Sequence, residues 1–310
     1  MMKKQPWSLR IVSAVCLVVL LSLVACVGPG TSSPSSPESV AQRRPVAFLT
    51  DYGSKDFYVG AVKGVMVGIN PALQLYDLTH EVTPYDIHEG AVTLLLASRH
   101  WSSQTVFLAI VDPGVGTERR PIAALTSDGR IFVGPDNGLF TLVLREFGAK
   151  EVRQITNQAW MRPGERSYSF HGRDIFGPVA AWLSLGKPFV EVGPVISDYV
   201  TLPIGVSRQE GRQLIGEVLW IDAYGNVQAN ITGTQAKQAG WVIGDQILIR
   251  VGTASPFVAL FVHTYGDVPE GSSLLFQAST DFLEMAINMG SMKEWLKAEV
   301  GAPVVLEKAP

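Results

Sequence analysis

Short apolar runs alternate with longer amphipathic segments through the first two-thirds of the chain, beginning near Pro45. Uncharged runs such as VFLAIV predict strands that are buried on both faces of a sheet. The expected strands are 46–50, 73–79, 106–111, 121–126 and 130–133, and the expected helices are 57–69, 86–100, 139–147 and 174–185. Strands that alternate with helices of this length are typical of βαβ units. We therefore expect an α/β domain with a mostly parallel, Rossmann-like sheet.

The pattern changes after about residue 200, where short β-rich runs follow one another. Turn sequences such as PEG and AYGN separate these runs, which indicates a smaller antiparallel β-barrel-like domain or a sandwich. The expected strands are 213–221, 226–231, 245–251, 257–264 and 272–278, with helical segments at 281–289 and 292–300. We expect the α/β domain to occupy residues 45–203 and the β-rich domain residues 204–310.

The first 44 residues lie outside this alternation. Basic residues near the start precede a long apolar run that ends in Leu-Val-Ala-Cys at Cys26. This arrangement is typical of a secretory signal peptide, and small residues before a cysteine resemble a bacterial lipobox. We expect a signal peptide at 1–25, a lipidated Cys26 and a flexible tether over 26–44. The chain would then be a lipid-anchored lipoprotein of the bacterial cell envelope, facing outside the cytosol. An uncleaved anchor helix and a plain secretory signal are the alternatives.

Charge and cysteine content exclude several classes of function. The 310 residues carry a net charge of −3, so the chain lacks the basic surface that nucleic-acid binding requires. Removal of residues 1–25 would leave Cys26 as the single cysteine, and its acylation would leave no thiol for a disulfide. The five histidines are scattered and form no HExxH or His-x-His pair, so we expect no metal site.

Polar residues at the end of a predicted strand are the main candidates for chemistry. The run 106–111 is followed directly by Asp112, which begins a glycine-flanked turn that also carries Arg119. His171 lies in a second glycine-flanked segment, SFHGRD. Ligands of open α/β sheets bind beyond the carboxyl ends of the strands, and a carboxylate, a guanidinium and an imidazole together can orient and deprotonate a water. The alternative is an Asp–Arg turn bracket with an unrelated surface histidine.

Other polar residues at strand ends are weaker candidates. Asp51 follows the first strand and could accept hydrogen bonds from a vicinal diol such as that of ribose, or cap the next helix. No GxGxxG dinucleotide fingerprint follows that strand. Tyr85 could offer an aromatic wall to a base or sugar. In the second domain, Asp222, Tyr224 and Asn226 share an Asx-Gly turn, and the Asn226 amide could read the edge of an adenine.

Six segments occur in the order and spacing of one family: LTDYGSKDFYVGAVKG, DLTHEVTPYDIHEGA, VDPGVGTERR, GPDNG, FHGRDIF and IDAYGN. On these motifs the chain resembles the S-adenosyl-L-methionine (SAM) hydroxide adenosyltransferases, or SAM hydrolases, which are relatives of the fluorinase and chlorinase enzymes. The resemblance spans about residues 46–300. It implies hydrolysis of SAM to adenosine and L-methionine by attack of an activated water on C5′ of the ribose, with SAM as substrate and with neither cofactor nor metal.

The resemblance also implies roles for single residues. Asp112, Arg119 and His171 match the family's water-activating triad. Asp51 would hold the ribose diol, and Tyr85 would cover the sugar. The full set of implied substrate-binding residues is Asp51, Tyr85, Phe170, Asp222, Tyr224, Asn226 and Ser279. Asp281 stands where the family usually has glycine, and there it would either repel the methionine carboxylate or point away from it.

Partners and competing functions follow from the same resemblance. Relatives assemble as trimers with the site between subunits, so we expect a homotrimer. The halide-using relatives lack the counterparts of Asp112 and His171, which favours water as the nucleophile here. Because SAM is made and used in the cytosol, the predicted envelope location leaves an alternative open. That alternative is a lipid-anchored protein that binds adenosine or a related nucleoside without turnover.

Overall fold

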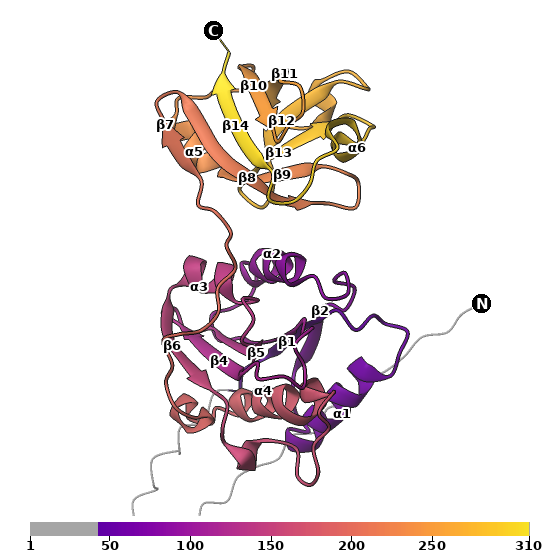
Figure 1. Cartoon of the computed structure of the whole chain (residues 1–310), viewed down its shortest axis with the longest axis vertical. Coiled ribbons are helices and arrows are strands. Elements are labelled where there is room, and N and C mark those ends of the chain that lie inside the picture. Colours follow the sequence, from indigo (N-terminus) through magenta and orange to yellow (C-terminus); the bar gives the residue numbers. More distant parts are fainter. Residues whose placement is uncertain (1–42, 310) are drawn as a thin grey trace, which may run out of the picture. The chain divides into compact units, whose positions relative to one another are not determined.

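The computed structural model describes residues 43–309, and Figure 1 shows its course. The predicted signal peptide, Cys26 and nearly all of the predicted tether lie outside the described residues. The two parts that follow match the predicted fold class, an α/β domain and then a β-barrel. The boundary predicted between residues 203 and 204 stays a prediction.

A six-stranded sheet forms the centre of the first domain. Its strands are β1 (Val46–Thr50), β2 (Leu75–Thr79), β3 (Val106–Ile110), β4 (Pro121–Thr126), β5 (Ile131–Pro135) and β6 (Ala149–Gln154), in the order β2-β1-β3-β5-β4-β6. The first four strands in this order pair in parallel, and β4 is antiparallel to both of its neighbours. The sheet is therefore mostly parallel, as the sequence predicts.

Helices cover both faces of this sheet (Figure 1). The helices are α1 (Tyr58–Ile69), α2 (Ile87–Ser98), α3 (Thr141–Phe147) and α4 (Gly177–Ser184). Side chains of α1 and α4 share one core with one face of the sheet, and those of α2 and α3 share the core on the other face. Because β1 and β3 are fully buried between these layers, their sequences are continuous apolar runs and only the residues beyond their ends are polar.

The second domain is a closed barrel. Its strands are β7 (Arg208–Glu210), β8 (Gln213–Ile221), β9 (Val227–Thr232), β10 (Gln246–Val251), β11 (Phe257–Val262), β12 (Ser273–Gln277), β13 (Phe282–Ile287) and β14 (Pro303–Lys308), with helices α5 (Gly233–Gln238) and α6 (Met292–Leu296). The order β14-β10-β11-β12-β13-β9-β8 closes through pairing of β14 with β8, and β7 extends β8 outside the ring. The β11–β12 pair is parallel, so the barrel is mixed rather than purely antiparallel.

The structure corrects three details of the predicted elements. The segment predicted as a helix at 281–289 is strand β13, because its apolar residues fill the barrel and its backbone pairs with β12 and β9. Strands β6 and β14 are not predicted from the sequence. The first is a largely polar edge strand and the second has only a short apolar stretch before Glu307, so neither gives a clear apolar run. The polar three-residue strand β7 is not predicted either. Short 3₁₀ turns also occur at Gln158–Trp160, Phe189–Val192 and Tyr265–Asp267.

Gly134 in β5 provides a test of how closely the central strands pack. A Cβ atom on Gly134 would lie 2.1 Å from the Ala109 carbonyl oxygen of β3 and 3.0 Å from the Phe140 ring. Gly134→Ala should therefore lower the free energy of unfolding by about 3 kcal/mol, because β3 and β5 would have to separate. Urea unfolding measures this change.

Gly64→Ala is the matched control. Gly64 lies in the exposed interior of α1, and nothing lies within 4 Å of an added Cβ. That substitution should raise the free energy of unfolding by roughly 0.5–1 kcal/mol, because alanine favours a helix interior over glycine. Equal effects of the two substitutions would contradict the close packing of β3 against β5.

Candidate functional site

Two aspartates meet at one edge of the parallel sheet. Strands β1 and β3 pair in parallel with Thr50 opposite Ile110, so both strands end at the same level. Asp51 follows the first directly, and Asp112 lies just beyond the second. The register of these buried strands therefore places both carboxylates at the carboxyl edge, where open α/β sheets bind their ligands.

Asp112, Arg119 and His171 form one hydrogen-bonded cluster. Arg119 Nε donates to Asp112 Oδ1 over 3.0 Å, and Arg119 Nη2 donates to Asp112 Oδ2. The same Nη2 lies 3.1 Å from His171 Nδ1. The Asp112 and Arg119 side chains are each only 6% exposed. The structure thus brings together the three residues that the sequence singles out, and a turn bracket with a separate surface histidine does not describe them.

The guanidinium determines which nitrogen of His171 carries the proton. A guanidinium has no acceptor atom, so Nδ1 must accept and the neutral ring must carry its hydrogen on Nε2. Burial and the positive charge of Arg119 lower the pKa of His171 below its ordinary value. At neutral pH His171 is therefore an uncharged imidazole whose Nε2–H is a donor.

Asp112 is the group of the cluster that can accept a proton. Burial raises the pKa of the Asp112 carboxyl above its ordinary value, and the charge and hydrogen bonds of Arg119 limit that rise. Arg119 Nη1 is buried and has no partner among the described residues. The cluster therefore combines a carboxylate acceptor with two groups that offer donors, Arg119 and His171.

Glycines let the two motif segments approach each other closely. Gly116 has a φ of 79°, and a Cβ there would lie 2.6 Å from the Tyr168 carbonyl oxygen. Gly172 would place a Cβ 2.5 Å from the Tyr52 hydroxyl. His171 immediately precedes a π-helical turn at Gly172–Phe176, a type of irregularity that is frequent at functional sites. These close contacts explain why both motifs carry glycine at positions 116 and 172.

Asp51 holds the loop that carries Tyr85. Asp51 Oδ2 accepts the Tyr85 backbone N–H over 2.9 Å. Burial raises the pKa of Asp51, and the hydrogen bond from Tyr85 opposes the rise. Tyr85 has a φ of 71°, which is strained for an aromatic residue. Tyr85 is 71% exposed. The positive φ therefore holds an exposed aromatic ring near Asp51 at the edge of the sheet.

A cavity of about 540 Å³ opens where these groups meet. Of the predicted residues, Asp51, Tyr85, Asp112, Phe170 and His171 line it. The sequence reasoning missed several further lining residues: Tyr52, Phe57, Tyr58, Ser167, Ser169 and Arg173. Three of these are aromatic and pack around the Phe170 ring. The adjacent aromatic residues at 57–58 are a sequence signal for this cluster, although the hydrophobic pattern by itself indicates only the start of a helix there.

The predicted residues of the second domain lie around a different cavity. Tyr224 and Asn226 line a cavity of about 730 Å³ in the barrel, together with Tyr265. Asp222 accepts the backbone N–H groups of Tyr224 and Asn226 over 2.9 and 2.8 Å, which holds the turn between β8 and β9. None of the residues that line the cavity at the sheet edge lines this one.

Ser279 lines neither of these cavities. It borders a smaller one, of about 320 Å³, together with Thr280 and Asp281. Asp281 has a φ of 68°, which explains why glycine would suit this position. Its carboxylate accepts a hydrogen bond from Gln277 Nε2 over 2.7 Å. Asp281 is therefore hydrogen-bonded to the last residue of β12.

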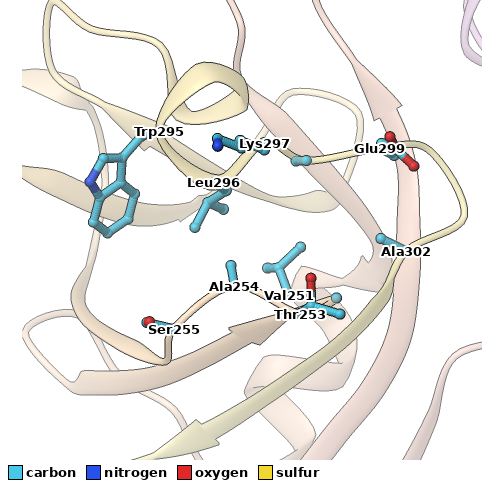
Figure 2. Close-up of a pocket in the computed structure, with 11 residues that line it drawn as sticks. Val251, Thr253, Ala254, Ser255, Trp295, Leu296, Lys297, Glu299 and Ala302 are labelled. Carbon is cyan, nitrogen blue, oxygen red and sulfur yellow. The ribbon is translucent and has the colours of Figure 1, made fainter.

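A further cavity of about 750 Å³ lies in the barrel between the segment after β10 and the segment that includes the end of α6 (Figure 2). Trp295 and Lys297 lie on one side of it, and Ala254 and Ser255 lie on the other. None of the predicted site residues lines it, and it contains no histidine or aspartate. Over residues 43–309, no three His, Cys, Asp or Glu side chains are grouped so that they could hold a metal ion.

Comparison with known proteins agrees with this geometry. Family models described as the SAM hydroxide adenosyltransferase N-terminal and C-terminal domains match residues 46–193 and 216–305. The chain is 39% identical to an (R)-S-adenosyl-L-methionine hydrolase of Thermus thermophilus, over 85% of this chain and 99% of that protein. It is 38% identical to a protein of the same name from Salinispora tropica, over 83% and 95% of the two chains. Proteins named fluorinase match at 28% identity.

A solved structure supports the fold as well. The crystal structure of an uncharacterized conserved protein from Thermotoga maritima matches with a TM-score of 0.81 and 38% identity, over 85% of this chain and all of that one. The fold of this chain is therefore shared with a solved structure that is 38% identical to it.

The prediction of a lipid-anchored lipoprotein in the cell envelope is wrong by this comparison. The relatives that match over 95% and 99% of their own length are named as SAM hydrolases and not as lipoproteins. No helix within residues 43–309 is both long enough and apolar enough to cross a membrane. The prediction of a signal peptide and membrane anchor depends on the basic residues near the start, the apolar run and the Leu-Val-Ala-Cys segment that ends at Cys26, all of which lie outside the described residues. No finding supports that prediction.

Proposed function

Since this chain belongs to the SAM hydroxide adenosyltransferase family, we propose that the cavity at the sheet edge holds the reacting part of SAM and that Asp112, Arg119 and His171 activate the attacking water. The enzyme is a SAM hydrolase, which converts SAM and water to adenosine and L-methionine. The observation that carries the proposal is the shared guanidinium of Arg119, which binds both Asp112 and His171 beside the cavity.

The proposed reaction is a single displacement at C5′ of the ribose. The water oxygen forms a bond to C5′ while the bond from C5′ to sulfur breaks, and the electron pair of that bond returns to sulfur. Methionine leaves as a neutral thioether, so its departure requires no general acid. Positioning of the water and exclusion of bulk solvent would supply most of the acceleration.

We assign the proton that water loses to Asp112. Arg119 occupies His171 Nδ1, so Nε2 carries hydrogen and the neutral ring has no free acceptor. Asp112 has two carboxylate oxygens and a raised pKa, which favours proton acceptance near neutral pH. In this scheme His171 donates from Nε2 to orient the water. The sequence-based expectation is that these groups together orient and deprotonate the water, and the present assignment gives deprotonation to Asp112 and orientation to His171.

The remaining predicted residues would hold the substrate. We propose that Asp51 accepts hydrogen bonds from the ribose diol and that Tyr85 and Phe170 enclose the sugar, because all three line the same cavity. Asp222, Tyr224 and Asn226 would contact the adenine and methionine. Ser279 would contact the methionine end, and a hydrogen bond from Gln277 fixes the nearby Asp281 carboxylate.

Halide as the nucleophile is the competing chemistry within the wider family. The chain retains Asp112 and His171, whose counterparts the halide-using relatives lack, and its matches to proteins named fluorinase are weaker than those to SAM hydrolases. Both observations favour water.

Asp112→Asn tests the assignment of the proton acceptor. Its amide cannot take a proton from water, so kcat for SAM hydrolysis should fall by about 100-fold or more. Adenosine binding should stay close to that of the wild type, since the substitution is isosteric. Chromatography of adenosine and methionine measures turnover, and calorimetry measures binding.

The control for this variant is Asp198→Asn. Asp198 pairs with Arg120 over 2.9 Å at the surface and does not line the cavity, so this variant should turn over like the wild type. Undiminished turnover in Asp112→Asn would remove Asp112 from the mechanism.

We also propose that the active form is a homotrimer. The ribose-binding and base-binding candidates line separate cavities in the two domains, and a neighbouring subunit could bring one of each together. Mass photometry should then give a particle of three chains of 33.6 kDa. A monomer with full SAM hydrolase activity would contradict the proposal.

A further inference from the structure

Hydrogen bonds use both N–H groups of the Asn226 side-chain amide and leave its oxygen without a partner among the described residues. Asn226 Nδ2 donates to Asp222 Oδ2 over 2.8 Å and to the Tyr265 hydroxyl over 3.0 Å. These two bonds use both N–H groups of the amide. Oδ1 has no partner among the described residues, and Asn226 lines the barrel cavity. Oδ1 is therefore the one polar atom of the amide that remains available to accept a hydrogen bond from a ligand in that cavity.

The residues that contact Asn226 prevent its side-chain amide from flipping, which would exchange the positions of its oxygen and nitrogen. The Tyr265 hydroxyl donates its one proton to Glu284 Oε1 over 2.8 Å, so it can only accept from Asn226. Glu284 is buried, and its other oxygen accepts from Gln228 Nε2 over 2.6 Å. A reversed Asn226 amide would place its oxygen against the Asp222 carboxylate and against a hydroxyl with no proton left to give.

The protonation state of Tyr265 agrees with this arrangement. Burial and then the adjacent Glu284 carboxylate raise the pKa of the Tyr265 hydroxyl, so Tyr265 keeps its proton at neutral pH. Burial raises the pKa of the Glu284 carboxyl, and the hydrogen bonds that it accepts from Gln228 and Tyr265 oppose this rise by stabilising the ionised carboxylate. The direction of each hydrogen bond in the network is thus determined from Glu284 outward to Asn226.

We propose that Tyr265 and Glu284 are positioning residues, which hold the Asn226 amide so that it selects purines with a 6-amino group. The inference rests on the proposed function, in which Asn226 contacts the adenine. An adenine amino group would donate to Asn226 Oδ1. The 6-oxo group of hypoxanthine or guanine would instead place a second acceptor against that oxygen, and both would lose a partner.

Calorimetric titration of the protein with adenosine and with inosine tests this selection. The wild type should bind adenosine about tenfold or more tightly than inosine. Tyr265→Phe keeps the ring but removes the hydroxyl, so the amide gains freedom to turn and the ratio of the two dissociation constants should fall severalfold. Asn226→Ala removes the acceptor and should abolish the preference.

Tyr76→Phe is the matched control, because Tyr76 lies half-exposed in β2 and lines neither of the proposed substrate cavities. It should leave the ratio unchanged. Equal binding of both nucleosides by the wild type, or a wild-type ratio in Tyr265→Phe, would overturn the inference. Such results beside normal SAM hydrolysis would leave the proposed reaction intact, whereas absence of SAM hydrolysis in the wild type would overturn that reaction itself.

Discussion

The guanidinium of Arg119 is the interaction on which the candidate site depends. It is buried, it holds both oxygens of Asp112, and it donates to His171 Nδ1. Removing one partner of such a buried pair leaves an uncompensated charge, which costs about 3–5 kcal/mol. In the proposed mechanism the same contacts also determine the chemistry, because they leave Asp112 as the acceptor of the proton from water and make His171 a neutral donor. The contacts of Arg119 would therefore both stabilise the site and determine its reactivity.

The rest of the first domain brings these groups together. Pairing of β1 with β3 places Asp51 and Asp112 at one edge. The turn after Asp112 returns Arg119 to the same place, and the close approach of Gly116 to the Tyr168 carbonyl joins that turn to the segment before His171. The strained, positive φ of Tyr85 places its aromatic ring beside the cavity. The sheet thus supplies the register, and the segments beyond the strand ends supply the polar and aromatic side chains.

The sequence predicts the polar residues at the strand ends well, because buried parallel strands give an unambiguous apolar pattern. Asp112 directly follows such an apolar run, residues 106–111. His171 comes from a distant segment, and only the family motifs link it to Asp112 before the structure is known. Strand β13 shows the opposite case, since its apolar spacing also fits a helix and only pairing with β9 and β12 selects the strand. Tyr52 and the Tyr265–Glu284 pair could not be predicted, because their roles depend on contacts between residues far apart in the chain.

The pH dependence of kcat/KM for His171→Asn tests the central claim most directly. Burial raises the pKa of Asp112, so a carboxylate acceptor loses activity as pH falls through that raised value. If Asp112 takes the proton, the His171→Asn enzyme should be slower than the wild type and should keep this loss of activity on the acid side. If His171 is the proton acceptor, the variant should lose the acid-side dependence together with its activity, and that result would contradict the account.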